Sequence, residues 1–441
     1  MTTPICDFVR RYAESGALRL HMPGHKGSPV LGMEQLDITE IDGADSLYEA
    51  SGIIRESEDN AAALFGAPTF YSTEGSSHCI RAMLYLALLH AQSTGQHPTI
   101  AAGRNAHKTF LSAAALLDFD VRWLPPEKPD SYLSCPIDGA ALNTALSNES
   151  VAAVYITSPD YLGNTADIAA LAKVCHAHGA LLLVDNAHGG YLRFLPESRH
   201  PIDLGADLCC DSAHKTLPVL TGGAYLHIAT NLPPMFAAQA KQALALFGST
   251  SPSYLIMQSL DAANALLATT FPQRLKEFLP AIAAAKKTLA AHGYTLRGDE
   301  PLKITIAAKN YGYTGKSLAD ALLEKNIVSE FADPDFLVLM LPPDKQPLER
   351  LIDALTSLPR RPAITDAPPA FTLPERVLSI REAAMSVSET LPAAQARGRV
   401  LAAATVGCPP AVPIVVCGER INEEAIQCFN YYGIEEVTVV S

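Results

Sequence analysis

The segment Asp207–His227, DLCCDSAHKTLPVLTGGAYLH, joins two apolar, strand-like runs through a short polar turn centred on Lys215. Moving a lysine amine out of water is costly unless a partner compensates for the lost hydration. A lysine in an ordinary surface loop is the simpler interpretation, because most lysines are exposed. A hydroxyl on each side of the His-Lys pair, at Ser212 and Thr216, favours a chemical use for the amine instead.

The segments on either side of this one repeat the order strand, polar loop, helix. Residues 67–91 (APTFYSTEGSSHCIRAMLYLALLHA) and 98–117 (PTIAAGRNAHKTFLSAAALL) show it, and residues 180–190 (ALLLVDNAHGG) form an apolar strand that runs into polar residues. Near-continuous apolar strands that alternate with helices are typical of a parallel sheet covered on both faces. We therefore predict an α/β fold with a mainly parallel sheet, with ligands bound beyond the carboxyl ends of the strands.

The length of 441 residues and the hydrophobic content of 48% predict more than one domain. A proline-rich stretch at 358–376, with five prolines, is expected to be a linker. The predicted parts are an N-terminal segment, a large ligand-binding domain, a smaller α/β domain and a C-terminal domain that mixes helix and short strands. Their boundaries are, in the same order, 1–60, 61–255, 256–360 and 370–441.

Charge and patterning argue against several classes of partner. The net charge of −13 disfavours nucleic acid and anionic membranes, which select for an excess of Lys and Arg. The sequence has no run of about 20 apolar residues and no secretory signal, so we expect a cytoplasmic protein. The nine cysteines include no CxxC pair, and Pro23 and Gly24 interrupt the His21–His25 spacing, so no metal site is predicted.

Three polar features are expected at the same sheet edge. Lys215 supplies an amine, Asp185 ends the apolar strand LLLVD, and the loop TEGSS, with Gly75, Ser76 and Ser77, precedes a helix whose first amides attract anions. An amine, a buried carboxylate and a phosphate cradle are what pyridoxal 5'-phosphate requires. The lysine would bind the aldehyde, the aspartate would keep the ring nitrogen protonated, and the loop would hold the phosphate.

His107, in GRNAHKT, follows another predicted strand. A solvated loop histidine is the ordinary alternative to an imidazole that stacks on the coenzyme ring. Lys108, directly after it, is the rival for the covalent attachment. We rank Lys108 below Lys215 because Asp185 is expected to precede the attached lysine by about one further strand.

Longer motifs resemble one known family. They are LRLHMPGHKGSP (18–29), DITEIDGADSLYEASGIIRESEDNAAALFGA (37–67), STSPSYLIMQSLD (249–261), SIREAAMSVSETLPAAQARGRV (379–400) and PPAVPIVVCGERI (409–421). Together with the TEGSS, GRNAHKT, DNAHGG and SAHKT blocks, they resemble the Orn/Lys/Arg decarboxylase family over nearly the whole chain. The resemblance implies a PLP-dependent transferase (aspartate aminotransferase-like, fold type I) architecture with a C-terminal α+β decarboxylase-type domain. It also implies a short form without the N-terminal wing domain of larger members.

The resemblance also implies roles for individual residues. Lys215, Asp185, His107 and His214 are the implied catalytic residues. The hydroxyls of Thr250 or Ser251 are implied to reach the phosphate of a neighbouring subunit, which predicts a homodimer with shared active sites. The implied cofactor-binding residues are Gly75, Ser76, Ser77, His107, Asp185, Ala187, His188, Ser212, His214, Lys215, Thr250 and Ser251.

The implied reaction is decarboxylation of L-arginine, L-lysine or L-ornithine to the amine, a polyamine precursor, and CO₂. A basic substrate tail needs a carboxylate, and Glu330 and Asp333 are the candidates, with Glu49 and Glu382 weaker ones; a solvated acidic loop at 330–333 is the alternative. Another PLP reaction on the same fold, such as transamination or a lyase step, and a PLP-binding relative without activity remain open.

Three blocks depart from the family pattern. The usual Asp-Glu-Ala-His reads Asp-Asn-Ala-His, with Asn186 in place of the acid. The usual Arg-Glu-Ala-Phe-Phe is Arg-Glu-Ala-Ala-Met at 381–385, and the usual Pro-Tyr-Pro-Pro-Gly is Gly-Cys-Pro-Pro-Ala at 407–411. None of these changes touches Lys215 or Asp185, so the coenzyme prediction is safer than the substrate prediction.

Overall fold

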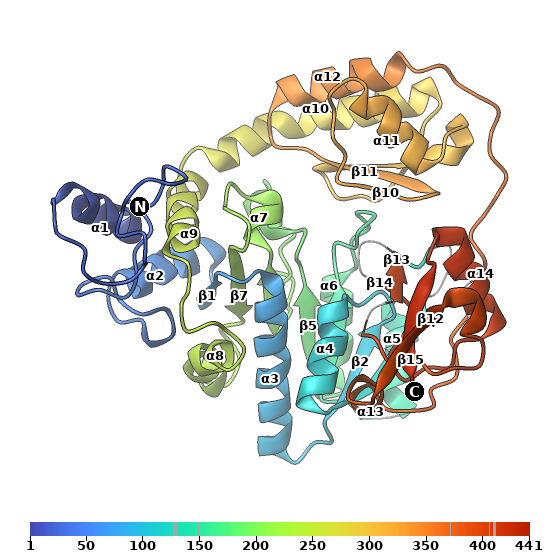
Figure 1. Cartoon of the computed structure of the whole chain (residues 1–441), viewed down its shortest axis with the longest axis horizontal. Coiled ribbons are helices and arrows are strands. Elements are labelled where there is room, and N and C mark those ends of the chain that lie inside the picture. Colours follow the sequence, from blue (N-terminus) through green and yellow to red (C-terminus); the bar gives the residue numbers. More distant parts are fainter. Residues whose placement is uncertain (127–130, 149, 371, 405, 409–411) are drawn as a thin grey trace. The chain divides into compact units, whose positions relative to one another are not determined.

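The computed structural model of the chain describes residues 1–126, 131–148, 150–370, 372–404, 406–408 and 412–441 (Figure 1). Two compact units can be distinguished. The first comprises Met1–His97, Ala152–Val154 and Ile168–Gln273, and the second comprises Pro98–Val151, Tyr155–Asp167 and Arg274–Ser441. These units divide the chain at other places than the predicted domain boundaries, which stay a prediction.

Seven strands form the main sheet, in the order β1-β7-β6-β5-β4-β2-β3. Their bounds are β1 (Thr69–Ser72), β2 (Thr99–Gly103), β3 (Asp120–Leu124), β4 (Ala153–Thr157), β5 (Leu181–Asp185), β6 (Leu208–Asp211) and β7 (Ala224–Ile228). Strands β5 and β6 are parallel, as are β2 and β3, whereas β7 runs antiparallel to both β6 and β1. The prediction of an α/β fold with a mainly parallel sheet is confirmed.

Strands β5 and β6 are buried along their whole length, as their sequences LLLVD and LCCD predict. Helix α3 (Ser76–Thr94) lies against β6 and β7, and helix α6 (Ile168–Ala177) lies against β5. The same unit contains α1 (Pro4–Glu14), α2 (Ile53–Phe65), α8 (Met235–Ala245) and α9 (Tyr254–Ala268). Because β5 and β6 are parallel neighbours, with Asp185 opposite Cys210, their carboxyl ends bring the polar residues that follow them to one edge of the sheet.

The second unit contains the predicted smaller α/β region. Four antiparallel strands lie in the order β10-β11-β9-β8, with bounds β8 (Thr295–Arg297), β9 (Lys303–Ala307), β10 (Phe331–Ala332) and β11 (Phe336–Met340). The helices of this region are α10 (Phe271–His292), α11 (Gly315–Leu323) and α12 (Lys345–Thr356). Helix α11 packs against β11, consistent with the alternation of helix and strand in the sequence.

The C-terminal region has its own apolar core, to which β14 (Val412–Val415), α14 (Glu423–Tyr432) and β15 (Glu436–Val440) contribute buried side chains. Strand β15 pairs antiparallel with β12 (Ser388–Pro392), and β14 pairs with β13 (Val406–Cys408). Of the departing block 407–411, residues 409–411 lie outside the described residues. Among the helices described, none is long and apolar enough to cross a membrane.

Candidate active site

Lys215 lies at the carboxyl end of β6, in the single helical turn α7 (Ala213–Thr216). Its backbone N–H donates to the carbonyl of Ser212 at 2.9 Å, which closes the turn. The half-buried amine Nζ lies 3.2 Å from Nε2 of His188, which is buried in the turn after β5. The structure thus brings the predicted lysine and one of the predicted histidines into contact.

Asp185 is the last residue of β5 and is only 3% exposed. Its Oδ1 accepts the N–H of Ala187 at 3.2 Å, and the thiol of Cys210 on the adjacent strand lies 3.7 Å from the same oxygen. These contacts fix the carboxylate at the mouth of the sheet. Its predicted partner, the ring nitrogen of the coenzyme, requires such a buried and oriented acid.

The predicted anion cradle lies at the start of α3. Gly75 has a φ of 73°, a left-handed conformation that glycine adopts without strain, and its N–H donates to the carbonyl of Gly222 at 2.7 Å. Ser76 begins the helix, and its hydroxyl accepts a 2.6 Å hydrogen bond from Ser212, the residue after β6. Ser77 follows in the first turn of this 19-residue helix, where the dipole favours an anion.

The cradle and the lysine turn are adjacent. A Cβ placed on Gly75 would lie 3.9 Å from Cε1 of His214, and a Cβ on Gly222 would lie only 2.8 Å from the carbonyl oxygen of Thr73. Gly222 has a φ of 100°, so a side chain at this position would be both strained and in collision. The loop that precedes α3 and the loop that follows Lys215 therefore fit together through two glycines.

His214 is held in one tautomer. Its Nδ1 lies 3.0 Å from the carbonyl oxygen of Gly223, so Nδ1 carries the proton and Nε2 presents a lone pair. Burial lowers the pKa of His214, the bond to Gly223 opposes this shift, and the charge of Lys215 adds to the lowering. The ring is therefore neutral at pH 7 and is a hydrogen-bond acceptor at Nε2, which makes it a poor proton donor there.

His107 lies in the second unit, as the N-cap of α4 (Lys108–Leu117). Its Nδ1 accepts the backbone N–H of Thr109 at 3.2 Å, which fixes the orientation of the ring and leaves the proton of the neutral imidazole on Nε2. Stacking on the coenzyme stays a prediction. Lys108, the rival attachment residue, has an exposed side chain at the first position of the helix.

The remaining predicted residues have different surroundings. Thr250 and Ser251 are exposed in the loop before α9, as a role at a neighbouring subunit requires, and that role stays a prediction. Glu330 is exposed and accepts a 2.9 Å hydrogen bond from the hydroxyl of Tyr161. Asp333 is buried, and its Oδ1 accepts the backbone N–H groups of Asp335 and Phe336 in the β10–β11 turn, while burial raises its pKa to about 6.

These geometries favour Glu330 over Asp333 as the partner of a basic substrate tail. Asp333 is buried and its Oδ1 is occupied by the turn that it stabilises, whereas the carboxylate of Glu330 is accessible to solvent. Both roles stay predictions.

The residues at the carboxyl ends of β5 and β6 fit pyridoxal 5'-phosphate. An amine, a buried carboxylate and a helix N-terminus with two serine hydroxyls are complementary to an aldehyde, a protonated ring nitrogen and a phosphate. All three features belong to the first unit. Ala187 is buried in the same turn as Asp185 and His188.

Sequence reasoning missed a polar network behind this site. Asp211, the last residue of β6, is fully buried and contacts Asn186, His200 and His227. The only sequence signal was the ending of the apolar run LCCD in an acid, the same pattern that identified Asp185 at the end of β5.

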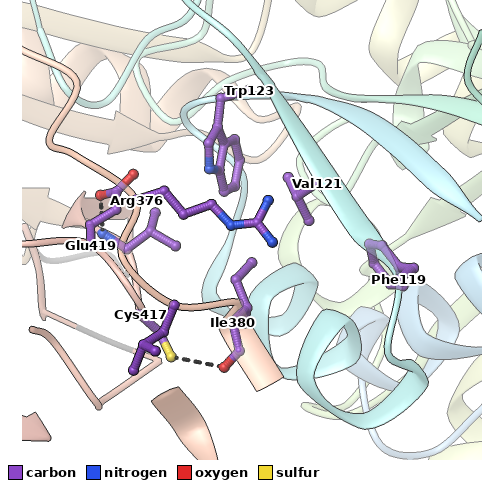
Figure 2. Close-up of a pocket in the computed structure, with 9 residues that line it drawn as sticks. Phe119, Val121, Trp123, Arg376, Ile380, Cys417 and Glu419 are labelled. Carbon is purple, nitrogen blue, oxygen red and sulfur yellow. Dashed lines mark hydrogen bonds between the residues drawn. The ribbon is translucent and has the colours of Figure 1, made fainter. Parts of the chain in front are cut away.

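A small cavity in the second unit lies between β3 and the C-terminal region (Figure 2). It is lined by Phe119, Val121, Trp123, Arg376, Leu378, Ile380, Val416, Cys417 and Glu419, and its volume of about 20 Å³ accommodates about one water molecule. It is too small for an amino acid or a coenzyme. Its lining includes Glu419, which forms a buried ion pair with Arg104 at 2.7 Å.

Known proteins resemble this chain over almost its full length. The uncharacterized protein YaaO of Bacillus subtilis (strain 168) is 30% identical over 468 residues, covering 97% of this chain and 93% of the relative. The arginine decarboxylase of the same organism is 29% identical over 466 residues, covering 96% of this chain and 92% of the relative.

Solved structures confirm the fold. The lysine decarboxylase LdcF of Francisella novicida superposes with a TM-score of 0.80 at 17% identity, covering 100% of this chain and 81% of the other. The alanine–glyoxylate aminotransferase of Nostoc sp. gives a TM-score of 0.54 at 18% identity, covering 69% of this chain and 85% of the other. The predicted aminotransferase-like architecture is therefore confirmed.

Two family profiles match the sequence itself. The profile described as Orn/Lys/Arg decarboxylase, major domain, matches residues 3–305, and the profile described as Orn/Lys/Arg decarboxylase, C-terminal domain, matches residues 369–438. The chain therefore belongs to the Orn/Lys/Arg decarboxylase family, the PLP-dependent decarboxylases of basic amino acids.

Proposed function

We propose that this protein decarboxylates a basic L-amino acid, with L-arginine as the first substrate to test, and that it carries pyridoxal 5'-phosphate on Lys215. The observation that carries the proposal is the 3.2 Å contact between Nζ of Lys215 and Nε2 of His188, at a sheet edge where Asp185 ends the neighbouring strand. The name of the arginine decarboxylase relative from Bacillus subtilis supports arginine ahead of lysine and ornithine.

Different residues of the chain would hold the ring and the phosphate of the coenzyme. When bound, pyridoxal 5'-phosphate supplies an aldehyde for amines and a cationic ring that draws electrons from the bond to the departing CO₂. Asp185 would keep the ring-nitrogen proton in place, and the first turn of α3 would hold the phosphate. The Ser76–Ser212 hydrogen bond ties this cradle to the lysine turn, so the groups at both ends of the coenzyme would be pre-oriented.

Lys215 is the better candidate for returning a proton to the substrate Cα after CO₂ leaves. His214 is neutral at pH 7 and its proton is on Nδ1, engaged with Gly223, so its Nε2 has no proton to give. The amine of Lys215 has protons at Nζ, and His188 lies within hydrogen-bond distance to orient it. Lys215 is therefore the proposed proton donor, and Nε2 of His214 can only accept a hydrogen bond.

The decisive experiment incubates the purified protein, loaded with pyridoxal 5'-phosphate, with L-arginine, L-lysine and L-ornithine in separate reactions. We expect release of CO₂ and formation of agmatine from L-arginine at the highest kcat/KM. Formation of keto acid without CO₂ would show an aminotransferase instead. A coenzyme absorbance that responds to amino acids without product would show a binding protein without turnover.

Glu330 is proposed to bind the basic tail of the substrate. Replacing it by glutamine removes the charge but keeps the size, and loss of a hydrogen bond to a charged group is expected to raise KM roughly 10- to 100-fold. The measurement is steady-state kinetics with the preferred substrate, and Glu324→Gln, an exposed acid at the end of α11, is the matched control. An unchanged KM in Glu330→Gln would remove Glu330 from the substrate site.

The proposed active unit is a homodimer. The N-terminal segment 18–36 exposes a series of large apolar side chains: Leu18, Leu20, Met22, Val30, Leu31, Met33 and Leu36. Exposed apolar surface on this scale is typical of an interaction site. We propose that a second copy of the chain covers this segment and receives Thr250 and Ser251 at its phosphate cradle.

Light scattering on the holoenzyme tests the dimer. The expected mass is that of two chains, and the double substitution Leu20→Asp and Leu31→Asp is expected to shift the protein to the monomer because buried charges without partners are costly. A monomeric and fully active wild-type protein would contradict the shared-site proposal.

A further inference from the structure

A buried polar network lies directly behind the coenzyme-binding turn. Oδ2 of Asp211 accepts hydrogen bonds from Nε2 of His200 and from Nε2 of His227, both at 3.1 Å. Its other oxygen, Oδ1, accepts from Nδ2 of Asn186 at 2.7 Å. All four side chains are completely buried, so each polar contact replaces a contact with water that the fold has removed.

The network keeps Asp211 ionised. Burial by itself raises the pKa of this carboxyl, but the attraction and hydrogen bonds of His200 and His227 outweigh the burial, and the pKa of Asp211 is lowered. An ionised carboxylate accepts stronger hydrogen bonds than a neutral group does. The bond from Asn186 to Asp211 is therefore a strong and directional one.

Asn186 fixes the turn that contains two proposed coenzyme residues. It stands between Asp185 and the Ala187–His188 pair, its N–H donates to the carbonyl of Cys210 at 3.0 Å, and its carbonyl accepts the N–H of Gly189 at 2.8 Å. A Cβ on Gly189 would lie 1.9 Å from Oδ1 of Asn186, so the amide side chain fills the inside of the turn. The side chain of Asn186 therefore packs tightly against the backbone of Gly189.

Asn186 and Asp211 form a donor–acceptor pair, in which the amide donates and the carboxylate accepts. An acid at position 186, which the family pattern would place there, would set two carboxylates at hydrogen-bond distance in a dry interior, where like charges repel strongly. An amide opposite an acid gives one well-formed hydrogen bond instead. The change at position 186 is therefore explained by the acid on the neighbouring strand.

These atoms could also be considered as metal ligands, because ligand-type atoms of His200, Cys209 and Asp211 lie within 4.8 Å of one another. The carboxylate oxygens, however, already accept hydrogen bonds from two imidazoles and an amide. Both oxygens of Asp211 are therefore engaged in hydrogen bonds, and Asn186 connects them to the backbone of the turn after β5.

We propose that Asp211 is a positioning residue of the decarboxylase site, which acts through Asn186 to hold Asp185 and His188 in place for the coenzyme. The inference rests on the proposed function, since it concerns the same site. Asp211 itself touches neither substrate nor coenzyme. Residues 186 and 211 then form a pair in which one must be an amide and the other an acid.

A double-mutant cycle tests the pair. Asn186→Asp sets two acids against each other, and Asp211→Asn removes the charged acceptor, so that a bond between the two amides forms only if one of them turns over. The combined variant Asn186→Asp/Asp211→Asn restores an N–H to carboxylate bond in the opposite direction, while the remaining oxygen at position 211 still accepts from the two histidines. We expect each single variant to weaken coenzyme binding about tenfold or more, and the combined variant to recover to within about threefold of the wild type.

The readouts are the dissociation constant for pyridoxal 5'-phosphate and the pH dependence of the absorbance of the bound coenzyme, measured together with thermal unfolding of the apoprotein. A displaced Asp185 should shift the pH profile, which loss of stability alone would not do. If Asn186→Asp does not fold, recovery of a folded, coenzyme-binding protein in the combined variant supports the pairing, and failure to recover contradicts it.

Asp207→Asn is the matched control. Asp207 is a buried acid immediately before β6, at the opposite end of the strand from Asp211, and Oδ2 of Asp207 accepts from Nε2 of His176 at 3.0 Å and from the N–H of Leu182 at 2.7 Å. This variant should lower the unfolding temperature without changing coenzyme affinity or the pH profile. The inference would be overturned if the single variants at positions 186 and 211 changed only the unfolding temperature, as this control does. It would also be overturned if the combined variant bound the coenzyme no more tightly than the weaker-binding of the two single variants.

The outcomes separate this inference from the proposed function. A wild-type protein that binds no coenzyme contradicts the proposed function. A wild-type protein that binds coenzyme and decarboxylates, but shows additive effects at 186 and 211, contradicts only the positioning role of Asp211.

Discussion

Replacing Lys215 by alanine is expected to abolish decarboxylation and the covalent attachment of the coenzyme while the protein stays folded. The amine is half-buried at the end of β6 and contacts His188, so its removal deletes both the attachment atom and the proposed proton donor. Loss of proton transfer alone typically costs about 10²- to 10⁴-fold in rate, and loss of the covalent link adds to this. The fold should survive, because alanine is a good helix former and leaves the α7 turn intact.

The measurement combines the absorbance of the bound coenzyme with mass spectrometry after borohydride reduction. In the wild type, the added mass should appear on the peptide that contains Lys215, and it should be absent in Lys215→Ala. Lys108→Ala is the control, since Lys108 is exposed at the first position of α4 and should leave both signals unchanged. Coenzyme attached to Lys108 in the wild-type protein would overturn the assignment.

The largest expected loss of stability follows removal of one partner of the Arg104–Glu419 ion pair. The two side chains are 2% and 5% exposed, and Nη2 of Arg104 lies 2.7 Å from Oε2 of Glu419. Among the described residues, Nε and Nη1 of Arg104 find no hydrogen-bond partner, although the guanidinium stacks over Trp123 at 4.9 Å. Glu419→Gln would leave a buried cation uncompensated, at a cost of about 3–5 kcal/mol in the free energy of unfolding.

Chemical denaturation of the apoprotein measures this loss. Arg376→Met is the control, because the Arg376–Asp120 pair has a similar distance of 3.2 Å but half-exposed partners, and such pairs contribute about 0–1 kcal/mol. The double substitution Arg104→Met/Glu419→Leu should lose less than Glu419→Gln, since it leaves no buried charge. Equal effects of Glu419→Gln and Arg376→Met would show that the buried pair is not stabilised as described.

The sequence was sufficient for the features that depend on local pattern. The apolar runs LLLVD and LCCD predicted buried neighbouring strands, and the polar residues at their ends predicted which edge carries Asp185 and Lys215. The glycine before Ser76 and the serines after it predicted the start of α3. In each case the information lies within a few residues of chain, where burial and turn preferences act directly.

The contacts that escaped prediction join residues far apart in the sequence. Asn186 and Asp211 are 25 positions apart, and Arg104 and Glu419 are 315 positions apart. A single sequence contains no signal for such pairs, because each partner alone is an ordinary polar residue that could equally be exposed. The burial of Asp333 was likewise not visible in the sequence, which shows an acid but not that its Oδ1 accepts two backbone N–H groups of a turn.

The hydrogen bond from Gly75 to Gly222 has a consequence for how this site can diverge. The segment that would hold the phosphate and the segment that follows the attachment lysine meet backbone to backbone, and there is no room for a side chain at Gly222. A change in the backbone of one segment would require a matching change in the other. The reason is that any larger residue at Gly222 would push apart the two ends of the proposed coenzyme site. A substitution that adds a side chain at Gly222 would therefore disturb the loop before α3 and the loop after Lys215 together.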